Sequence, residues 1–463
     1  MAHDIATAPL LPSSSPPRRN MFAFLCAALA SMTTILLGYN LALMSGAELF
    51  IREDLGLTGV QVELLTGSMN LFMLVSILAA GSIADRLGRR CTLVLANAFL
   101  MAGALAMALG ASFATLMAAR FVTSVGAGFS RVVAPVYNAE ISPPSTRGVL
   151  SSLLDMFVNV GILLSYVSNY AFAGMPMHLG WRVMFAVGAV PPVFLAAGVL
   201  AMPESPRWLA MRGRHDDAHA VLMRTSDTPA EADLRFREIK ASGGVWKEML
   251  ASPSASVRRI FVCVLGLQFF QQASGIDAII LYTPLVLQKA GISSNTNTVL
   301  AATVGVGVVK TCSILVATLL SDRLGRRPLL LASSGGCAVS LASVALALCV
   351  AGGSRATAVA CFVSVLAFVA AFSIGLGPVV ATYTSEIMPL RLRAQGTSLG
   401  TAVNRVACAV VALTFISLAD WITMPGCFFL YAGVAATTCV FVYTQLPETS
   451  GRSLEDMDVL FSK

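Results

Sequence analysis

One six-residue sequence, Asp-Arg-Leu-Gly-Arg-Arg, occurs twice in this chain of 463 residues, at positions 85–90 and again at 322–327. Each copy directly follows a long apolar stretch. Two weaker echoes recur in the same order, Tyr137–Pro143 with Tyr383–Pro389 and Pro203–Ser205 with Pro447–Thr449. Because three pairs of landmarks keep their order, the chain consists of two related halves.

The composition places both halves in a membrane. Hydrophobic residues make up 56% of the chain and charged residues 12%, whereas a soluble domain carries about 25% charged residues. Twelve apolar runs approach or exceed the ~20 residues of a spanning helix. They cover 22–46, 62–84, 91–110, 115–138, 149–173, 181–202, 259–287, 297–321, 329–350, 358–383, 396–419 and 425–445. The sequence therefore predicts an all-α membrane protein with twelve transmembrane helices in two pseudo-symmetric six-helix bundles. Duplicated halves with a site between them are typical of transporters.

Charge and composition divide the chain further. We expect a disordered tail at 1–20, an N-terminal bundle at 21–202, a linker with short helices at 203–258, a C-terminal bundle at 259–445 and a tail at 446–463. If both termini are cytoplasmic, only four basic residues fall in loops on the opposite side, as the positive-inside rule predicts. These are Arg52, Arg182, Lys289 and Arg355. Basic charge spread over many short loops does not indicate nucleic-acid binding.

Nothing in the sequence favours an enzyme or a metal site. The ten cysteines lie in or at the ends of apolar runs without metal-ligand spacing, so buried thiols are expected. No nucleophile elbow or glycine-rich phosphate loop is present. We expect no metal and no cofactor, with a co-transported proton as the one alternative.

Four signatures together carry a resemblance to a known family. They are Gly81-x-x-x-Asp85-Arg86-x-Gly88-Arg89-Arg90, Pro203-Glu204-Ser205-Pro206-Arg207-Trp208-Leu209, Gln271-Gln272-x-Ser274-Gly275-Ile276-Asp277, and Pro447-Glu448-Thr449-x-Gly451-Arg452-Ser453-Leu454-Glu455. The chain resembles the sugar porters of the major facilitator superfamily, and within them the plant polyol and monosaccharide transporters. The resemblance implies a monomeric plasma-membrane carrier of linear polyols or monosaccharides that works by alternating access. A carrier of another small polar solute and a non-transporting sugar sensor are the alternatives.

The resemblance also implies a cytoplasmic gate of ion pairs that bridges the two halves when the site faces outward. Its members would be Asp85, Arg89, Arg90, Glu140, Arg147, Glu204, Arg207, Asp322, Arg326, Arg327, Glu386, Arg393 and Glu448. Alternatively, these charges only anchor helix ends and fix topology. Topology needs positive charge but not paired acids at matching places in both halves, so the gate is favoured.

Polar residues in the middle of apolar runs predict the substrate site, because charge there is costly. Asp155, Asn159, Tyr166 and Tyr170 share one face of the fifth run. In the seventh run, Gln271, Gln272 and Tyr282 can line a cavity together with Asp277 only if the helix is broken near Gly275, before Pro284. By resemblance, the two glutamines and Asn404 contact sugar hydroxyls.

Two charged residues replace the asparagines that hexose members of the family have. Asp277 and Lys310 are of opposite sign on helices that should adjoin one cavity. An unpaired charge at that depth is costly, so we expect an ion pair between them. Whether the pair touches the substrate or only joins the helices is open, and so is the role of Arg131.

The coupling mode is also open. By resemblance, proton-coupled members place an aspartate after Gly38-Tyr39, where this chain has Asn40, and pair it with the arginine at position 120. An amide cannot act as the proton carrier. The sequence therefore permits facilitated diffusion, or symport with Asp155 as the proton-binding residue. A further departure is Ala381, where the family has a tryptophan that packs on the sugar.

Overall fold

The computed structural model describes residues 20–143, 147–241, 255–291, 295–350, 355–388 and 393–448, and all regular secondary structure in these ranges is helical. The N-terminal half contains α1 (Met21–Leu55), α2 (Gly59–Leu87), α3 (Arg89–Leu109), α4 (Phe113–Ile141), α5 (Arg147–Phe172), α6 (Met177–Gly188) and α7 (Pro191–Leu200). Three short helices follow, α8 (Pro206–Met211), α9 (His215–Thr225) and α10 (Pro229–Ala241). The C-terminal half contains α12 (Ala255–Ala273), α13 (Ile276–Lys289), α14 (Thr296–Leu324), α15 (Arg326–Cys349), α16 (Arg355–Ile374), α17 (Pro378–Ile387), α18 (Arg393–Ile422) and α19 (Met424–Gln445).

Every one of the twelve predicted runs coincides with a helix or a broken pair of helices. Three runs are broken, into α6 and α7, α12 and α13, and α16 and α17. Within the described residues, eleven spans are long and apolar enough to cross a membrane by length and composition. The twelfth is α4, which is 29 residues long but carries Arg120 and Arg131. The two arginines lower the mean hydropathy of α4, although the helix is long enough to cross a membrane.

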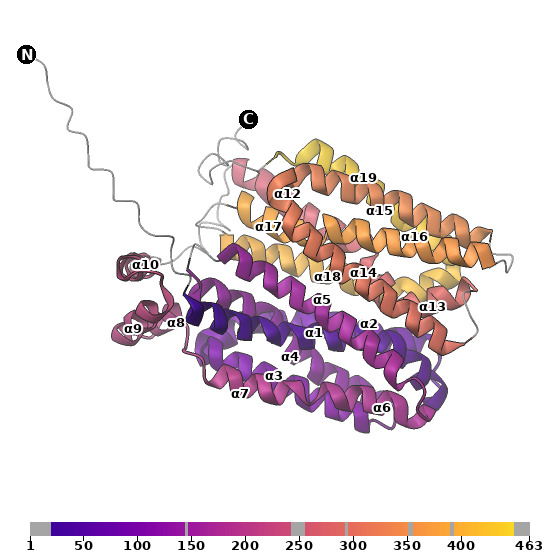
Figure 1. Ribbon diagram of the computed structural model, residues 1–463, viewed down its shortest axis with the longest axis horizontal. Coiled ribbons are helices and arrows are strands. Elements are labelled where there is room, and N and C mark those ends of the chain that lie inside the picture. Colours follow the sequence, from indigo (N-terminus) through magenta and orange to yellow (C-terminus); the bar gives the residue numbers. More distant parts are fainter. Residues whose placement is uncertain are drawn as a thin grey trace, which may run out of the picture.

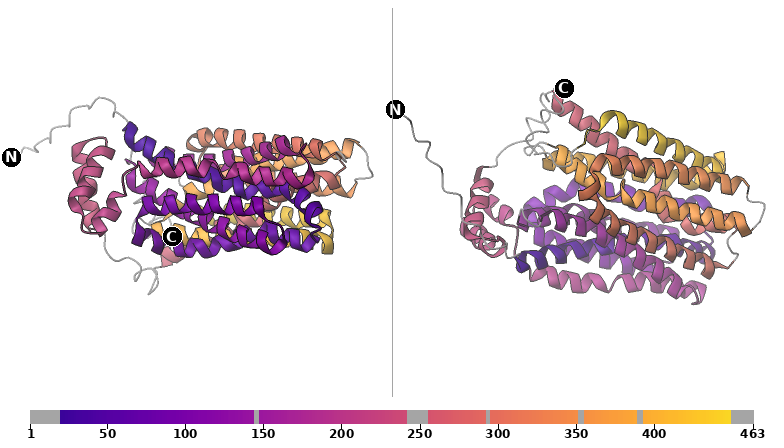
Figure 2. Two further views of the ribbon diagram at one scale, coloured as in Figure 1. Left: turned by 90° about the horizontal axis from the view of Figure 1, so that it is seen from below. Right: turned by 45° about the horizontal axis from the view of Figure 1, so that its top comes forward.

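The two halves lie side by side, with the helices of each half packed mainly on one another (Figure 1). Between the halves, α2 contacts α18, α5 contacts α14, and α1 contacts α13. The short helices α8–α10 lie at one end of the bundle in all views (Figures 1 and 2). We call this the tail end, where α1 begins, and the opposite end, where α1 ends and α2 begins, the far end. These three pairs of helices form the main part of the interface between the two halves.

The break in the seventh span is centred on Gly275, as predicted. Gly275 has φ +84°, and a Cβ there would lie 2.8 Å from the ring of Tyr431. Both the left-handed backbone and the close approach require glycine. A second irregularity follows at Tyr282, whose φ of −114° and ψ of 15° are not helical, two residues before Pro284. The polypeptide around Gln271, Gln272 and Asp277 is thus shaped by a built-in break.

The echo between Glu204 and Glu448 in the sequence corresponds to the same contact in both halves. Glu204 accepts hydrogen bonds from the backbone amides of Arg89 and Arg90, at the start of α3. Glu448 accepts from those of Arg326 and Arg327, at the start of α15. Carboxylates at helix N-termini are stabilised by the free amides and the helix dipole. The internal duplication is therefore structural as well as sequential.

The tyrosine echo is repeated in the same way. The hydroxyl of Tyr137 donates to the carbonyl oxygen of Pro203 over 2.9 Å, and that of Tyr383 donates to the carbonyl oxygen of Pro447 over 2.8 Å. Each bond ties the fourth span of its half to the segment after its sixth span. The tyrosine landmark and the Pro-Glu landmark are therefore in contact in each half.

Candidate functional site

Three amide side chains meet where the seventh span is broken. We call Gln271, Gln272 and Asn404 the amide group. Asn404 of α18 donates to Gln271 Oε1 over 2.8 Å, and Gln271 Nε2 donates to the carbonyl oxygens of Leu376 and Gly377 over 2.7 and 3.0 Å. Those carbonyls lie at the break between α16 and α17. Three predicted site residues are therefore brought together, on helices α12 and α18.

Gln272 connects the amide group to charged side chains. With its nitrogen toward the carboxylate, it donates to Asp277 Oδ2 over 3.1 Å and accepts from Arg405 Nη2 over 3.0 Å. This orientation matches a donor to an acceptor on both sides. Asp277 also accepts a contact from the thiol of Cys408. All four side chains are buried, so this arrangement of amide and charge is well fixed.

The prediction of a direct ion pair between Asp277 and Lys310 is wrong. Among the described side chains, the ion pairs within 4.0 Å do not include Lys310. Its charge nevertheless acts on both Asp277 and Asp155 at longer range. The Asp277 carboxylate is instead bound by Gln272 and Cys408.

Five ionisable side chains form what we call the charge cluster. Its members are Arg131 of α4, Asp155 of α5, Asp277 of α13, Lys310 of α14 and Arg405 of α18. The attraction between the acids and the bases crosses from one half to the other, while Arg131 and Arg405 repel each other. Arg131, whose role the sequence left open, is thus placed beside the predicted site. A cluster with three bases and two acids is attractive to acceptor groups of a ligand.

Two of the three tyrosines predicted on the site helices join helices to one another, whereas Tyr170 is exposed. The Tyr282 hydroxyl donates to the carbonyl oxygen of Ala412 over 2.9 Å, and its ring stacks on Phe415. Tyr282 is fully buried, so it packs the helices here rather than lining the amide group. Tyr166 of α5 donates across the interface to the carbonyl oxygen of Ile280 over 2.7 Å. Substrate contact by Tyr282 stays a prediction that this packing does not favour.

Asn40 and Arg120 lie together, but their side chains do not bond to each other. The Asn40 amide donates to the Leu36 carbonyl of its own helix over 2.9 Å. Arg120, with no exposed surface, donates to the carbonyl oxygens of Asn40 and Leu65 over 3.0 and 3.3 Å, and its Nη2 has no partner. A buried guanidinium without a carboxylate is costly. The partners of the Arg120 guanidinium are therefore two backbone carbonyl oxygens and not a carboxylate.

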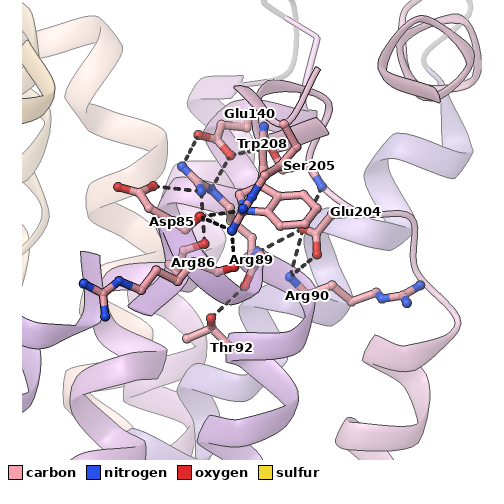
Figure 3. Close-up of polar contacts among 12 residues, drawn as sticks. Asp85, Arg86, Arg89, Arg90, Thr92, Glu140, Glu204, Ser205 and Trp208 are labelled. Atoms are coloured by element: carbon pink, nitrogen blue, oxygen red, sulfur yellow. Dashed lines mark hydrogen bonds and ion pairs between the residues drawn. The ribbon is translucent and has the colours of Figure 1, made fainter. Parts of the chain in front are cut away.

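The N-terminal half carries a connected ion-pair network at the tail end (Figure 3). Arg89 binds Asp85 over 2.9 Å and Glu140 over 3.0 Å. Glu140 also accepts from the Ser205 hydroxyl over 2.5 Å, and Trp208 Nε1 donates to the Asp85 carbonyl over 2.9 Å. The network joins α2, α3, α4 and α8 within one half.

Two further predicted gate residues, Arg90 and Arg327, also bind carbonyl oxygens of their own halves. Arg90 donates to the Met202 carbonyl and Arg327 to the Tyr443 carbonyl, whereas Arg207 is exposed. The side chains of Arg147, Asp322, Glu386 and Arg393 lie outside the described part of the chain. Bridging of the halves when the site faces outward therefore stays a prediction.

Glu204 offers a direct test of this network's contribution to stability. We expect Glu204→Gln to lower the midpoint of thermal unfolding in detergent by several degrees, because buried amides of α3 lose a charged acceptor, at about 1.5–3 kcal/mol. Arg207→Gln, three residues further along the chain and exposed, is the matched control and should leave the midpoint unchanged. Equal midpoints for both variants would contradict the role given to Glu204.

Sequence reasoning did not assign Arg405 or Cys408 to the site. Arg405 was visible as a basic residue inside the eleventh run, directly after Asn404, and charge at that depth was a usable signal. Cys408 gave no signal, because a thiol in an apolar run is ordinary. Only the folded chain shows that it touches Asp277.

The chain is similar to known proteins in both sequence and structure. Residues 26–461 match the family described as Sugar (and other) transporter. Polyol transporter 5 of Arabidopsis thaliana is 49% identical over 97% of this chain and 88% of its own length, and putative polyol transporter 1 of the same plant is 50% identical over 98% and 94%. In structure, the chain is similar to the xylose transporter XylE of E. coli in a partially occluded inward-open conformation, with TM-score 0.81 at 24% identity over 94% of this chain and 100% of that chain.

These findings bear on two predictions. The family and the relatives are transporters by description, so the prediction of a transporter rather than an enzyme is confirmed. The fold of XylE, a symporter of the major facilitator superfamily, confirms the predicted twelve-helix architecture. The chain is a transporter that belongs to the Sugar (and other) transporter family and has the fold of the major facilitator superfamily.

Proposed function

We propose that the chain carries linear polyols and monosaccharides across the plasma membrane by alternating access between its two halves. The observation that carries the proposal is the amide group beside the broken seventh span, next to the charge cluster. Amides offer donors and acceptors side by side, and a polyhydroxylated solute presents the same mixture. The descriptions of the similar proteins as polyol transporters support the substrate class.

The proposal includes an orientation and a coupling mode. The tail end faces the cytoplasm, because the basic loops lie there by the positive-inside rule, and the protein acts as a monomer. Transport is facilitative, because Arg120 is held by carbonyl oxygens and Asn40 cannot take up a proton. Symport is the alternative, with Asp155 as the proton carrier, since this carboxyl group is only partly buried and belongs to the charge cluster.

A second candidate is a carrier of another small polar solute. Two observations favour it. Ala381 on α17 is exposed and small, so this position offers no flat apolar surface for a sugar ring. The charge cluster has one more base than acids, which suits a polyhydroxylated solute that also bears a carboxylate.

Uptake in transporter-deficient yeast tests these proposals. Labelled sorbitol, mannitol, inositol, glucose, xylose and gluconate would be supplied with and without a protonophore. Entry of the polyols up to the external concentration, unaffected by the protonophore, is the expected result. Accumulation that the protonophore abolishes would replace facilitation by symport, and preference for gluconate would favour the second candidate. Solute binding without any uptake would indicate a sensor.

A further inference from the structure

A buried carboxylate joins the two halves near the far end. Glu63, four residues after the start of α2, accepts hydrogen bonds through Oε1 from the backbone amides of Ile416 and Ser417 over 2.7 and 3.0 Å. Its Oε2 accepts from the Ser417 hydroxyl. Ile416 and Ser417 belong to α18, so all three bonds cross the interface. Only 2% of Glu63 is exposed.

The backbone of α18 accepts and donates hydrogen bonds to side chains of both halves at this turn. In a continuous helix the amides of Ile416 and Ser417 are directed at the carbonyls of residues 412 and 413. α18 is helical throughout this turn, where the Ala412 carbonyl also accepts from the Tyr282 hydroxyl and Glu63 accepts from the two amides. One turn of α18 is thus shared by a tyrosine of its own half and a carboxylate of the other half.

Close packing brings α2 to the right distance. A Cβ on Gly67, one turn after Glu63, would lie 2.7 Å from Leu413 Cδ2 and 3.0 Å from the Ala412 carbonyl carbon. A larger residue at position 67 would push α2 away from α18. Because the helices touch here, the Glu63 carboxylate reaches the amides without solvent between them.

Glu63 has no basic partner. Among the described side chains, none of the ion pairs within 4.0 Å involves Glu63. The Glu63 carboxylate is instead bound by two backbone amides and a hydroxyl, and charge-assisted bonds of this kind are stronger than neutral ones. Glu48 of α1 is a useful contrast. It is also buried, but it accepts from Thr66 of its own half over 3.0 Å.

We propose that Glu63 is a gating residue of the transport cycle, which holds the far end closed by binding the Ile416–Ser417 turn. The inference rests on the proposed alternating access, because the far end can open only if α2 and α18 separate at this depth. When α2 and α18 separate, the three hydrogen bonds that Glu63 accepts are replaced by hydrogen bonds to water. Glu63 thereby sets how readily the site becomes accessible from the far side, without touching the solute.

The test measures opening of the far end directly. Ala42 of α1 is fully buried in an apolar cluster formed mainly by the C-terminal half. Ala42→Cys would be labelled in intact cells by a membrane-impermeant maleimide, and the labelling of the same protein without this cysteine would be subtracted. Glu63→Gln would be compared with Glu48→Gln, which removes a buried carboxylate whose hydrogen bond to Thr66 stays within one half. Ser417→Ala removes only the hydroxyl bond.

Loss of the Glu63 charge should raise the labelling rate about tenfold, with a smaller rise for Ser417→Ala and little change for Glu48→Gln. Equal labelling of Glu63→Gln and Glu48→Gln would overturn the proposal. If Glu63→Gln does not reach the membrane, unchanged labelling of Ser417→Ala overturns it instead. Labelling needs no identified solute. Failure of the gate is therefore distinct from failure of the proposed function, which the uptake of the unmodified protein tests.

Discussion

Uptake of polyol by Gln272→Ala should fall about a hundredfold relative to the unmodified protein. The Gln272 amide lies between the Asp277 carboxylate and the Arg405 guanidinium. Its removal takes one charge-assisted hydrogen bond from each of these charged groups, at about 1.5–3 kcal/mol each, and roughly 3 kcal/mol in total corresponds to about a hundredfold. Initial rates of labelled sorbitol uptake, normalised to the amount at the cell surface, measure the effect.

Gln268→Ala is the matched control for this variant. Gln268 lies one turn earlier on α12, is also buried, and makes a long contact of 3.4 Å with Thr384. Its loss should cost uptake less than about fivefold, because only one weak hydrogen bond disappears. If both variants transport equally well, the amide group is not the solute site.

Asn40→Asp should convert equilibration into accumulation. The new carboxylate would lie beside Arg120, whose Nη2 is buried without a partner, and would supply the missing titratable acid. One proton moved with each solute provides about 2.3 kcal/mol per 100 mV of membrane potential, or a concentration ratio of roughly fiftyfold. The measurement is the steady-state ratio of internal to external sorbitol.

A protonophore provides the control, since it should return the ratio in Asn40→Asp to one. Asn40→Gln, which alters size without adding an acid, should equilibrate like the unmodified protein. An unmodified protein that already accumulates sorbitol would show that a proton is taken up elsewhere. Asp155→Asn would then be expected to abolish accumulation.

The spans and their breaks could be predicted from the sequence because they follow from local chemistry. Apolar length marks a spanning helix, and Gly275 and Pro284 mark the interruption. The assignment of Gln271, Gln272 and Asn404 to one site followed from the resemblance to the family. The duplicated glutamates 204 and 448 were visible as sequence echoes, although their common role as acceptors at helix starts needed the fold.

Contacts between distant segments were not predictable in the same way. The expected Asp277–Lys310 ion pair rested on opposite charges on helices that should adjoin one cavity, whereas the carboxylate of Asp277 binds Gln272 and Cys408. Glu63 looks like an ordinary acid near the start of a helix. Its partners Ile416 and Ser417 are more than 350 positions away, and nothing in either local sequence marks them as partners.

Counterflow in reconstituted vesicles tests the account most directly. Purified protein would be placed in liposomes loaded with unlabelled sorbitol, and entry of a trace of labelled sorbitol would be followed over time. An alternating carrier returns from each side with a solute bound, so the label should rise above equilibrium and then decay. Gln272→Ala should show no such overshoot. Label that enters at a rate independent of the internal sorbitol would contradict two halves that expose one site to each side in turn.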